Sequence, residues 1–229
     1  KLGLFLEKNT RIKNNRNCIC FISQYIPIIN EFKDDGVKRL KSVYSNLINW
    51  SNEYDRRIVR IAMRNNKNDS EYLNELKFFK LSSGIDIELV DNVDYSSYEV
   101  GYESLVIVTI DSTIGFELFG SGKRVLFCGT TIGDEFLEKE NIDYIFRKMP
   151  DIVLLDNLTQ KEFDNKMNAL IRMKNEEYLS QTKEASETAK SSKVKTRHDA
   201  TAESSRALVC QWHDDKCTKR SVRTNIRNM

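Results

Sequence analysis

The sequence predicts an α/β protein with a doubly wound, mostly parallel sheet of about six strands and helices on both faces. Short apolar runs alternate with longer segments in which apolar residues recur at helical spacing. Some runs, such as 18–22, are apolar throughout, which is typical of parallel strands that are covered on both faces. Right-handed crossovers between successive strands then give the doubly wound arrangement.

The predicted strands and helices alternate through residues 17–178. Compact apolar runs bounded by polar residues or glycine predict strands at 18–22, 57–63, 85–90, 105–110, 124–128 and 152–155. Apolar residues spaced three and four apart predict helices at 36–54, 71–83, 96–102, 114–119, 134–140 and 159–174. In the 71–83 helix we expect Leu73, Leu76 and Phe79 to share the buried face. Thr159 is the expected cap of the closing helix.

Composition divides the chain into three parts. Residues 1–16 include a polar, basic run and are expected to be a linker or the remnant of a preceding domain. Residues 17–178 are expected to form the α/β domain. Residues 179–229 are rich in Ser, Thr, Lys, Glu and Ala, and we expect a basic tail that is mostly disordered or loosely helical. That composition would also suit a segment foreign to the domain.

The charge and hydropathy of the chain exclude two classes of protein. Lys and Arg number 36 against 34 Asp and Glu, so the net charge of +2 gives no electrostatic footprint for nucleic acid. No apolar run approaches the roughly 20 residues that a bilayer crossing needs. We therefore expect a cytoplasmic protein, in peripheral contact with the inner face of the membrane at most. The tail residues Cys210, His213 and Cys217, with His198 upstream, do not form a common zinc ligand set, so no metal is expected.

The turn that follows the 105–110 strand is the most informative polar segment. Residues 111–113, Asp-Ser-Thr, lead into a short helix whose free amide hydrogens and positive dipole end suit an anion such as phosphate. Glu117 lies one helical turn deeper, and a carboxylate accepts hydrogen bonds from paired hydroxyls such as those of a ribose. The same residue types also cap helices that bind nothing, and Glu117 alone fits an ordinary exposed helix position.

Three motifs at predicted strand ends resemble the bacterial surface-carbohydrate and capsule branch of the GT-B glycosyltransferases. They are CFISQ, AMRNN and DSTIGFE, in that order along the chain. The spacing of Glu117, Gly122 and Val125 also resembles the donor-binding signature of that fold, with Arg124 in place of the usual proline. The resemblance covers residues 17–178 and implies the C-terminal, Rossmann-like, nucleotide-binding half. An N-terminal half that binds the acceptor would be absent from this chain.

The resemblance also implies roles for individual residues. Ser112 and Thr113 would cradle the donor phosphates, while Glu117 would hold the ribose. Three further residues at strand ends would bind or line the phosphate and sugar, and they are Arg64, Ser23 and Gln24. The base would lie near residues that follow the third strand, and these are Asp91, Asn92, Ser97 and Glu99. Strand termination for Ser23 and Gln24, and a solvated or ion-paired surface position for Arg64, are the alternatives that need no ligand.

The sequence therefore predicts the donor-binding half of a metal-independent glycosyltransferase. It would use a nucleotide sugar without a further cofactor and transfer the sugar to a cell-surface polysaccharide or glycolipid. The catalytic base is not identified and is expected in the absent half. Two other functions stay open, a sugar-nucleotide epimerase on the same scaffold and a non-catalytic α/β interaction module.

Overall fold

The structure is a computed structural model of the chain. It describes residues 17–25, 34–55, 57–80, 87–129 and 149–191. All of these residues belong to the first of two compact units, which runs from Lys1 to Ser192. Three segments named in the sequence analysis lie outside the described residues, and they are the 1–16 linker, the 134–140 helix and the tail beyond residue 191.

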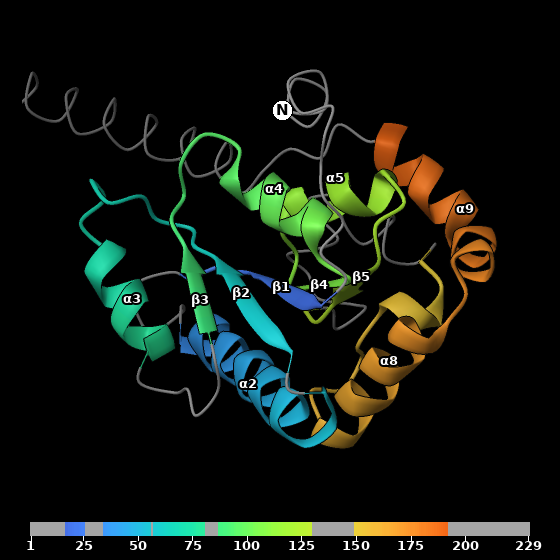
Figure 1. Ribbon diagram of the computed structural model, residues 1–229, viewed down its shortest axis with the longest axis horizontal. Coiled ribbons are helices and arrows are strands. Elements are labelled where there is room, and N and C mark those ends of the chain that lie inside the picture. The colour runs from blue at the N-terminus through green and yellow to red at the C-terminus, as the bar shows by residue number, and fades with distance from the viewer. Residues whose placement is uncertain (1–16, 26–33, 56, 81–86, 130–148, 192–229) are drawn as a thin grey trace, which may run out of the picture. The chain divides into compact units, whose positions relative to one another are not determined.

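Five parallel strands form one sheet in the order β3-β2-β1-β4-β5. The strands are β1 Cys18–Ile22, β2 Ile58–Ala62, β3 Ile87–Val90, β4 Val106–Thr109 and β5 Val125–Phe127. The chain proceeds outward from β1 to β3 and then returns to the other side of β1, so the strand order reverses between β1 and β4 (Figure 1). The predicted Rossmann-like α/β fold is confirmed, and its topological switch point lies between these two strands.

Helices cover both faces of the sheet. They are α2 Asp34–Trp50, α3 Tyr72–Lys80, α4 Ser96–Glu103, α5 Thr113–Gly120, α8 Gln160–Arg172 and α9 Asn175–Ser191. A π-helical turn, η2 Ser51–Asp55, continues α2. One face carries α2, α3 and α8, the opposite face carries α4 and α5, and α9 packs on α5 (Figure 1).

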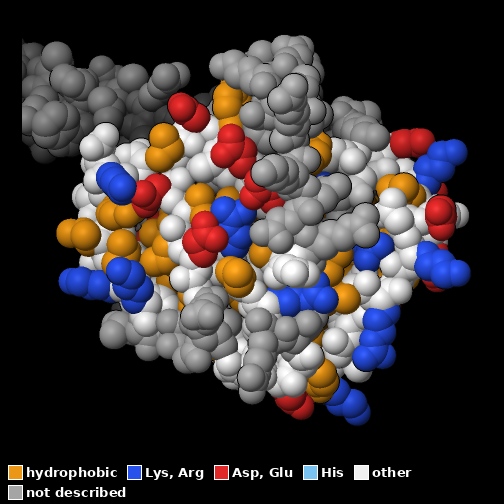
Figure 2. Space-filling model, in the orientation of Figure 1, with side chains coloured by type: hydrophobic (Ala, Val, Ile, Leu, Met, Phe, Trp, Pro, Cys, Tyr) orange, Lys and Arg blue, Asp and Glu red, His pale blue; other side chains and the backbone are white. Residues whose placement is uncertain are grey.

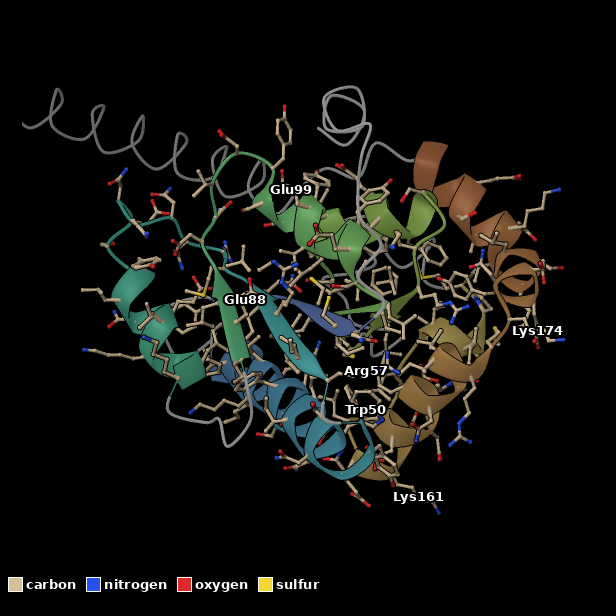
Figure 3. The ribbon with its side chains drawn as sticks, in the orientation of Figure 1. Trp50, Arg57, Glu88, Glu99, Lys161 and Lys174 are labelled. Carbon is tan, nitrogen blue, oxygen red and sulfur yellow. The ribbon has the colours of Figure 1, made fainter. Side chains whose placement is uncertain are left out.

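Burial of the central strands explains the apolar runs in the sequence. Every residue of β1 is buried, as expected for a parallel strand with helices on both sides. The buried stripe of α2 includes Tyr44, whose hydroxyl donates to the carbonyl of Phe79 at 3.0 Å and joins α2 to α3. Trp50 lies between α2 and α8 (Figure 3), and its indole nitrogen donates to Asn168 at 3.2 Å. These contacts fix the three helices on one face of the sheet.

The predicted sixth strand, at 152–155, is replaced by a 3-10 helix, η3 Asp151–Val153, and a single bridge from Leu154 to Phe127. The amide hydrogens of Val153 and Leu154 are used inside the turn, where they bond to the carbonyls of Pro150 and Asp151. They cannot then pair with β5. Leu154 is only 5% exposed. The apolar run at 152–155 is therefore explained by burial in the core, without a full strand.

The beginning of the predicted tail is helical. Residues 179–191 belong to α9, which packs against α5. Its buried stripe consists of residues spaced three and four apart, and they are Tyr178, Thr182, Ala185 and Ala189. Three of these four side chains are small, so a composition count overlooks the stripe, although the helical spacing is present in the sequence.

Two glycines set the position of α5. A Cβ at Gly115 would lie 2.7 Å from Cγ2 of Thr109, so glycine lets the helix approach β4 closely. Gly122, just past the helix, has a φ of +86°, a left-handed conformation that glycine adopts without steric cost. The glycines therefore bring the start of α5 to the end of β4.

Candidate functional site

The ends of β1 and β4 meet at the switch point, and Gln24 bridges them. Its side-chain oxygen accepts from the backbone N–H groups of Ile110, at 3.1 Å, and Asp111, at 2.8 Å. Its side-chain nitrogen donates to the carboxylate of Asp111, which offsets part of that negative charge. The predicted phosphate-binding residue Gln24 therefore lies at the switch point, and it occupies two amide hydrogens of the turn.

The start of α5 follows this turn directly. The N–H of Ser112 donates to the hydroxyl of Thr109 at 3.4 Å, and the first intrahelical bond of this helix runs from Phe116 to the carbonyl of Ser112 at 3.1 Å. The Ser112 side chain makes no capping bond within the described part of the chain. Because the first amides of a helix have no intrahelical acceptor, those of residues 113–115 point toward the switch point. Ser112 and Thr113 are both half-buried there.

Glu117 lies one turn further along α5, in contact with α4. Its Oε2 accepts a hydrogen bond of 2.7 Å from the hydroxyl of Tyr98, a residue that is only 4% exposed. Burial raises the pKa of Tyr98, and the hydrogen bond to Glu117 raises it further, so the tyrosine is a stable donor. Tyr98 therefore holds one oxygen of the Glu117 carboxylate.

A second cluster of polar groups surrounds Glu75 on α3. This carboxylate is fully buried and accepts from the N–H of Arg64 at 2.9 Å, the N–H of Asn65 at 2.9 Å and the Asn65 side chain at 2.7 Å. The hydroxyl of Ser23 donates to it as well. Sequence reasoning missed Glu75, although it precedes the buried Phe79 by four residues and therefore shares its face.

In α3, the apolar residues do not all face the sheet as predicted. Leu73, expected on the buried face, is 63% exposed, while Phe79 is buried as expected. The face that packs on the sheet carries the carboxylate of Glu75 in its first turn. Four hydrogen bonds compensate for the cost of removing that carboxylate from water. For this reason, the polarity of the side chains alone did not predict which side of α3 is buried.

Ser23 and Arg64 have contacts that bear on their predicted roles. Ser23 is 4% exposed, donates to Glu75 and accepts from the N–H of Tyr25 at 3.2 Å. The hydroxyl could donate to a phosphate only if its bond to Glu75 opened, and direct phosphate binding by Ser23 stays a prediction. Arg64 is half-buried at the end of β2, and its carbonyl accepts from the side chain of Asn92 at 2.6 Å.

The residues predicted to lie near the base are divided between two places. Asp91, at the end of β3, accepts from Lys67 at 2.7 Å and from the hydroxyl of Tyr72 at 2.6 Å, and these bonds lower its pKa. With Asn92 it lies at the same sheet edge as Arg64. Ser97 is buried in α4, and Glu99 is exposed on that helix, on the side away from the sheet (Figure 3). The structure places both residues in the first turn of α4, beside Ser96, whose hydroxyl donates to the carbonyl of Asp91 at 2.7 Å.

A second cation occurs at the edge without having been predicted. Arg39, on α2, donates to the carbonyl of Gly129, which follows β5. Its distance of 90 residues from Gly129 along the chain explains why no local pattern indicated it. Arg39 and Arg64 thus stand on either side of the switch point, at the ends of β5 and β2.

Charged side chains also meet over β2, β3 and α4 (Figure 2). Arg60 of β2 donates to Glu88 at 2.9 and 3.0 Å and to Glu103 at 2.6 Å. These three residues join two strands to α4 in one ion-pair cluster. Because the arginine is engaged by two carboxylates, we assign the cluster to the fold and not to the site.

Two further findings concern only the described residues. Among them, no group of three or more His, Cys, Asp or Glu side chains is placed to hold a metal ion. The tail cysteines and histidines are outside the described residues, so the absence of a metal requirement stays a prediction. No described helix is both long and apolar enough to cross a membrane.

The fold and the site together define a Rossmann-like α/β domain whose polar residues gather at the switch point. A protein family described as "putative O-antigen biosynthesis protein" matches residues 5–196, and the chain belongs to this family. No curated protein matches the chain. Membership confirms the surface-carbohydrate part of the resemblance seen in the sequence, but it does not distinguish glycosyl transfer from other reactions.

The solved structures that are similar to the chain include three with a named organism and ligand or activity. S. aureus MnaA, in a co-structure with UDP, is 16% identical, with a TM-score of 0.46 over 77% of this chain and 41% of that one. UDP-GlcNAc 2-epimerase from Neisseria meningitidis, bound to UDP-GlcNAc, is 13% identical, with a TM-score of 0.43 over 85% and 43%. The corresponding enzyme from Methanocaldococcus jannaschii is 13% identical, with a TM-score of 0.45 over 76% and 44%. The chain spans less than half the length of each.

Proposed function

We propose that this chain is the donor-binding half of a glycosyltransferase that builds a cell-surface carbohydrate from a nucleotide sugar. One observation carries the proposal, namely that α5 starts at the switch point without a side-chain cap and presents Glu117 one turn deeper. In parallel α/β sheets, ligands bind beyond the carboxyl ends of the strands at this point. Membership in an O-antigen biosynthesis family supports the surface-carbohydrate part.

The donor phosphates bind at the start of α5 in this proposal. The amide hydrogens of the first turn and the positive end of the helix dipole favour an anion there, and the hydroxyls of Ser112 and Thr113 add donors. Arg64 supplies positive charge from the neighbouring side of the edge. Gln24 acts indirectly, because its bonds to Ile110 and Asp111 fix the turn from which α5 starts.

Glu117 holds the ribose hydroxyls. A carboxylate accepts from both hydroxyls of a ribose, and the bond from Tyr98 limits the orientations that Glu117 can take. Asp91 and Asn92 remain as the residues nearest the base, because their bonds tie them to the loop that follows β2. We assign no direct contact with the donor to Ser23, Ser97 or Glu99.

The chemistry assigned to this half is stabilisation of the nucleotide phosphate as it leaves. Donors that are already oriented stabilise charge where it develops, so the start of α5 and Arg64 supply this without a metal ion. The acceptor hydroxyl needs a general base, which we assign to the part of the protein that binds the saccharide or glycolipid acceptor. Contact with the inner face of the membrane would follow from a lipid-linked acceptor and is part of the same proposal.

A thermal-shift screen with CMP, UDP, GDP, ADP and CDP tests the proposal. A ligand that binds only the folded state raises the melting temperature, so at least one nucleotide should stabilise the chain. The stabilising nucleotide also identifies the base of the donor. If none of the five binds, the donor site is wrong and a non-catalytic α/β module is favoured.

The reaction type is tested with the full-length protein and the matching nucleotide sugar. A glycosyltransferase leaves the nucleotide sugar intact, apart from slow hydrolysis, until an acceptor is added. An epimerase converts the nucleotide sugar without any acceptor, which nuclear magnetic resonance of the sugar protons detects. Conversion without an acceptor would therefore replace glycosyl transfer by epimerisation.

A further inference from the structure

We infer that Glu75 is a positioning residue for donor binding, because it fixes the ends of β1 and β2 from which Ser23 and Arg64 extend. The inference rests on the proposed function and deepens it. Glu75 is fully buried and has no place for a ligand, so its effect on the donor passes through the residues it holds.

The residues that donate to Glu75 lie at the carboxyl ends of β1 and β2. This edge of the sheet, where we place the donor, is called the ligand edge. Each of its two oxygens accepts two hydrogen bonds, from Ser23 and the N–H of Arg64 on one side and from the N–H and side chain of Asn65 on the other. A buried carboxylate is tolerated only when it is satisfied in this way. All four donors come from residues that directly follow β1 or β2, so the carboxylate holds two strand ends and one loop in a single arrangement.

Glu75 also stands in the middle of a longer set of contacts, which we call the edge row. Gln24, next to Ser23, bonds to the turn before α5, and on the other side Asn92 donates to the carbonyl of Arg64. The edge row thus runs from the end of β4 through β1 and β2 to the end of β3. A shift at Glu75 would therefore move groups on both sides of the proposed phosphate site.

The other explanation for Glu75 is that it only stabilises the fold. The two explanations differ in a measurable way, because a purely structural residue changes the melting temperature but not the nucleotide affinity of the protein that remains folded. A positioning residue changes that affinity as well. The double-mutant cycle with Arg64 adds a second distinction, since residues that act through one arrangement are not additive.

Glu75→Gln is the informative substitution. Glutamine has the same shape but only one acceptor oxygen, so its NH2 group faces either the two donors of Asn65 or the Ser23 hydroxyl and the N–H of Arg64. Glu88→Gln is the matched control, because it also removes one negative charge and disturbs a pair of hydrogen bonds, to Arg60. Figure 3 shows Glu88 on β3, the edge strand, where it bonds to Arg60 of β2.

Calorimetry of the full chain with the tightest nucleotide of the five-member panel, well below the melting temperature, measures the effect. We expect about tenfold weaker binding for Glu75→Gln and unchanged binding for Glu88→Gln. Arg64→Ala should weaken binding about tenfold in the original protein but add less than about twofold in the Glu75→Gln background.

The possible results of these binding measurements separate the inference about Glu75 from the proposed function. Equal affinity of Glu75→Gln and the original protein overturns the inference and leaves the proposed function standing. Full additivity with Arg64→Ala also overturns it, since Glu75 would not act through Arg64. If the original protein binds none of the five nucleotides, the proposed function and the inference about Glu75 are both wrong.

Asn65→Ala keeps the test decisive if Glu75→Gln does not fold. It removes only the 2.7 Å bond from the Asn65 side chain and leaves the other three donors of the carboxylate in place. We expect about threefold weaker nucleotide binding with a small change in melting temperature. Unchanged binding by a folded Asn65→Ala protein would then overturn the inference.

Discussion

Helices α5 and α8 both begin directly after a hydroxyl residue, yet the two hydroxyls are used differently. At α8, Thr159 accepts from the N–H of Glu162 at 3.4 Å and closes the first turn. At α5, the Ser112 side chain makes no such bond within the described residues. The far end of α8 is closed as well, because Arg124 donates to the carbonyls of Leu170, Ile171 and Met173, at 2.6, 3.3 and 2.7 Å.

The difference shows how position in the fold changes the use of the same residue type. The α8 helix packs on α2, so nothing outside the chain is needed to complete its ends. The α5 helix starts at the switch point, where ligands collect in folds of this class. A helix start without a side-chain cap among the described residues, at this place, is the feature that we assign to donor binding.

The largest expected effect tests the closed helix. Arg124→Ala removes three hydrogen bonds from a charged donor to the end of α8, together with the packing of the guanidinium on the ring of Tyr178. We expect the free energy of unfolding to fall by about 3 kcal/mol, measured by urea denaturation. Arg172→Ala, an exposed control on the same helix, should stay within about 0.5 kcal/mol of the original protein. A loss below about 1 kcal/mol for Arg124→Ala would show that water replaces the arginine as cap.

The next effect tests the open helix. Glu117→Ala should weaken nucleotide binding about tenfold and lower the free energy of unfolding by about 1 to 2 kcal/mol, because the buried hydroxyl of Tyr98 loses its acceptor. Glu117→Gln keeps an acceptor for Tyr98, so its unfolding free energy should match the original while binding still falls about fivefold. Calorimetry and urea denaturation separate the two quantities. Equal nucleotide affinity in all three proteins would remove Glu117 from the site.

The two hydroxyls themselves form a matched pair. Thr159→Ala should cost about 1 kcal/mol of unfolding free energy and leave nucleotide binding unchanged, because it removes a helix cap far from the switch point. Ser112→Ala should change stability by less than about 0.5 kcal/mol and weaken nucleotide binding about threefold. If both substitutions have the same two effects, the contrast between α5 and α8 has no functional meaning.

The smallest effect concerns a contact on the ligand edge but outside both helices. Bonds from Lys67 and Tyr72 hold the pKa of Asp91 below its usual value, so the contact stabilises the fold above the unfolded pKa and is lost as pH falls through the folded one. Asp91→Asn should lower the melting temperature slightly at pH 7. The difference between the two proteins should shrink below about pH 4, as scanning calorimetry would show. A difference that grows on acidification would reverse the assigned sign.

Much of the candidate site could be predicted from local patterns. Ser112, Thr113 and Glu117 stand in a strand-turn-helix segment, and a turn of this kind fixes their relation within a few residues. Arg64 and Gln24 follow apolar runs, so they were correctly expected at the carboxyl ends of strands. Ser97 and Glu99 follow the loop after β3 into the first turn of α4, and which of their side chains is buried depends on the packing of that helix.

The amino-acid sequence by itself determined the order of the strands and helices and the polar residues at the strand ends, because buried parallel strands and amphipathic helices have periods that are visible over a few residues. Only the tertiary structure decided which polar groups of the ligand edge already have hydrogen-bond partners within the chain. Glu75 and Ser23 are 52 residues apart, and Gln24 and Asp111 are 87 apart. Such contacts arise when separate strands align in one sheet, and no local period records them.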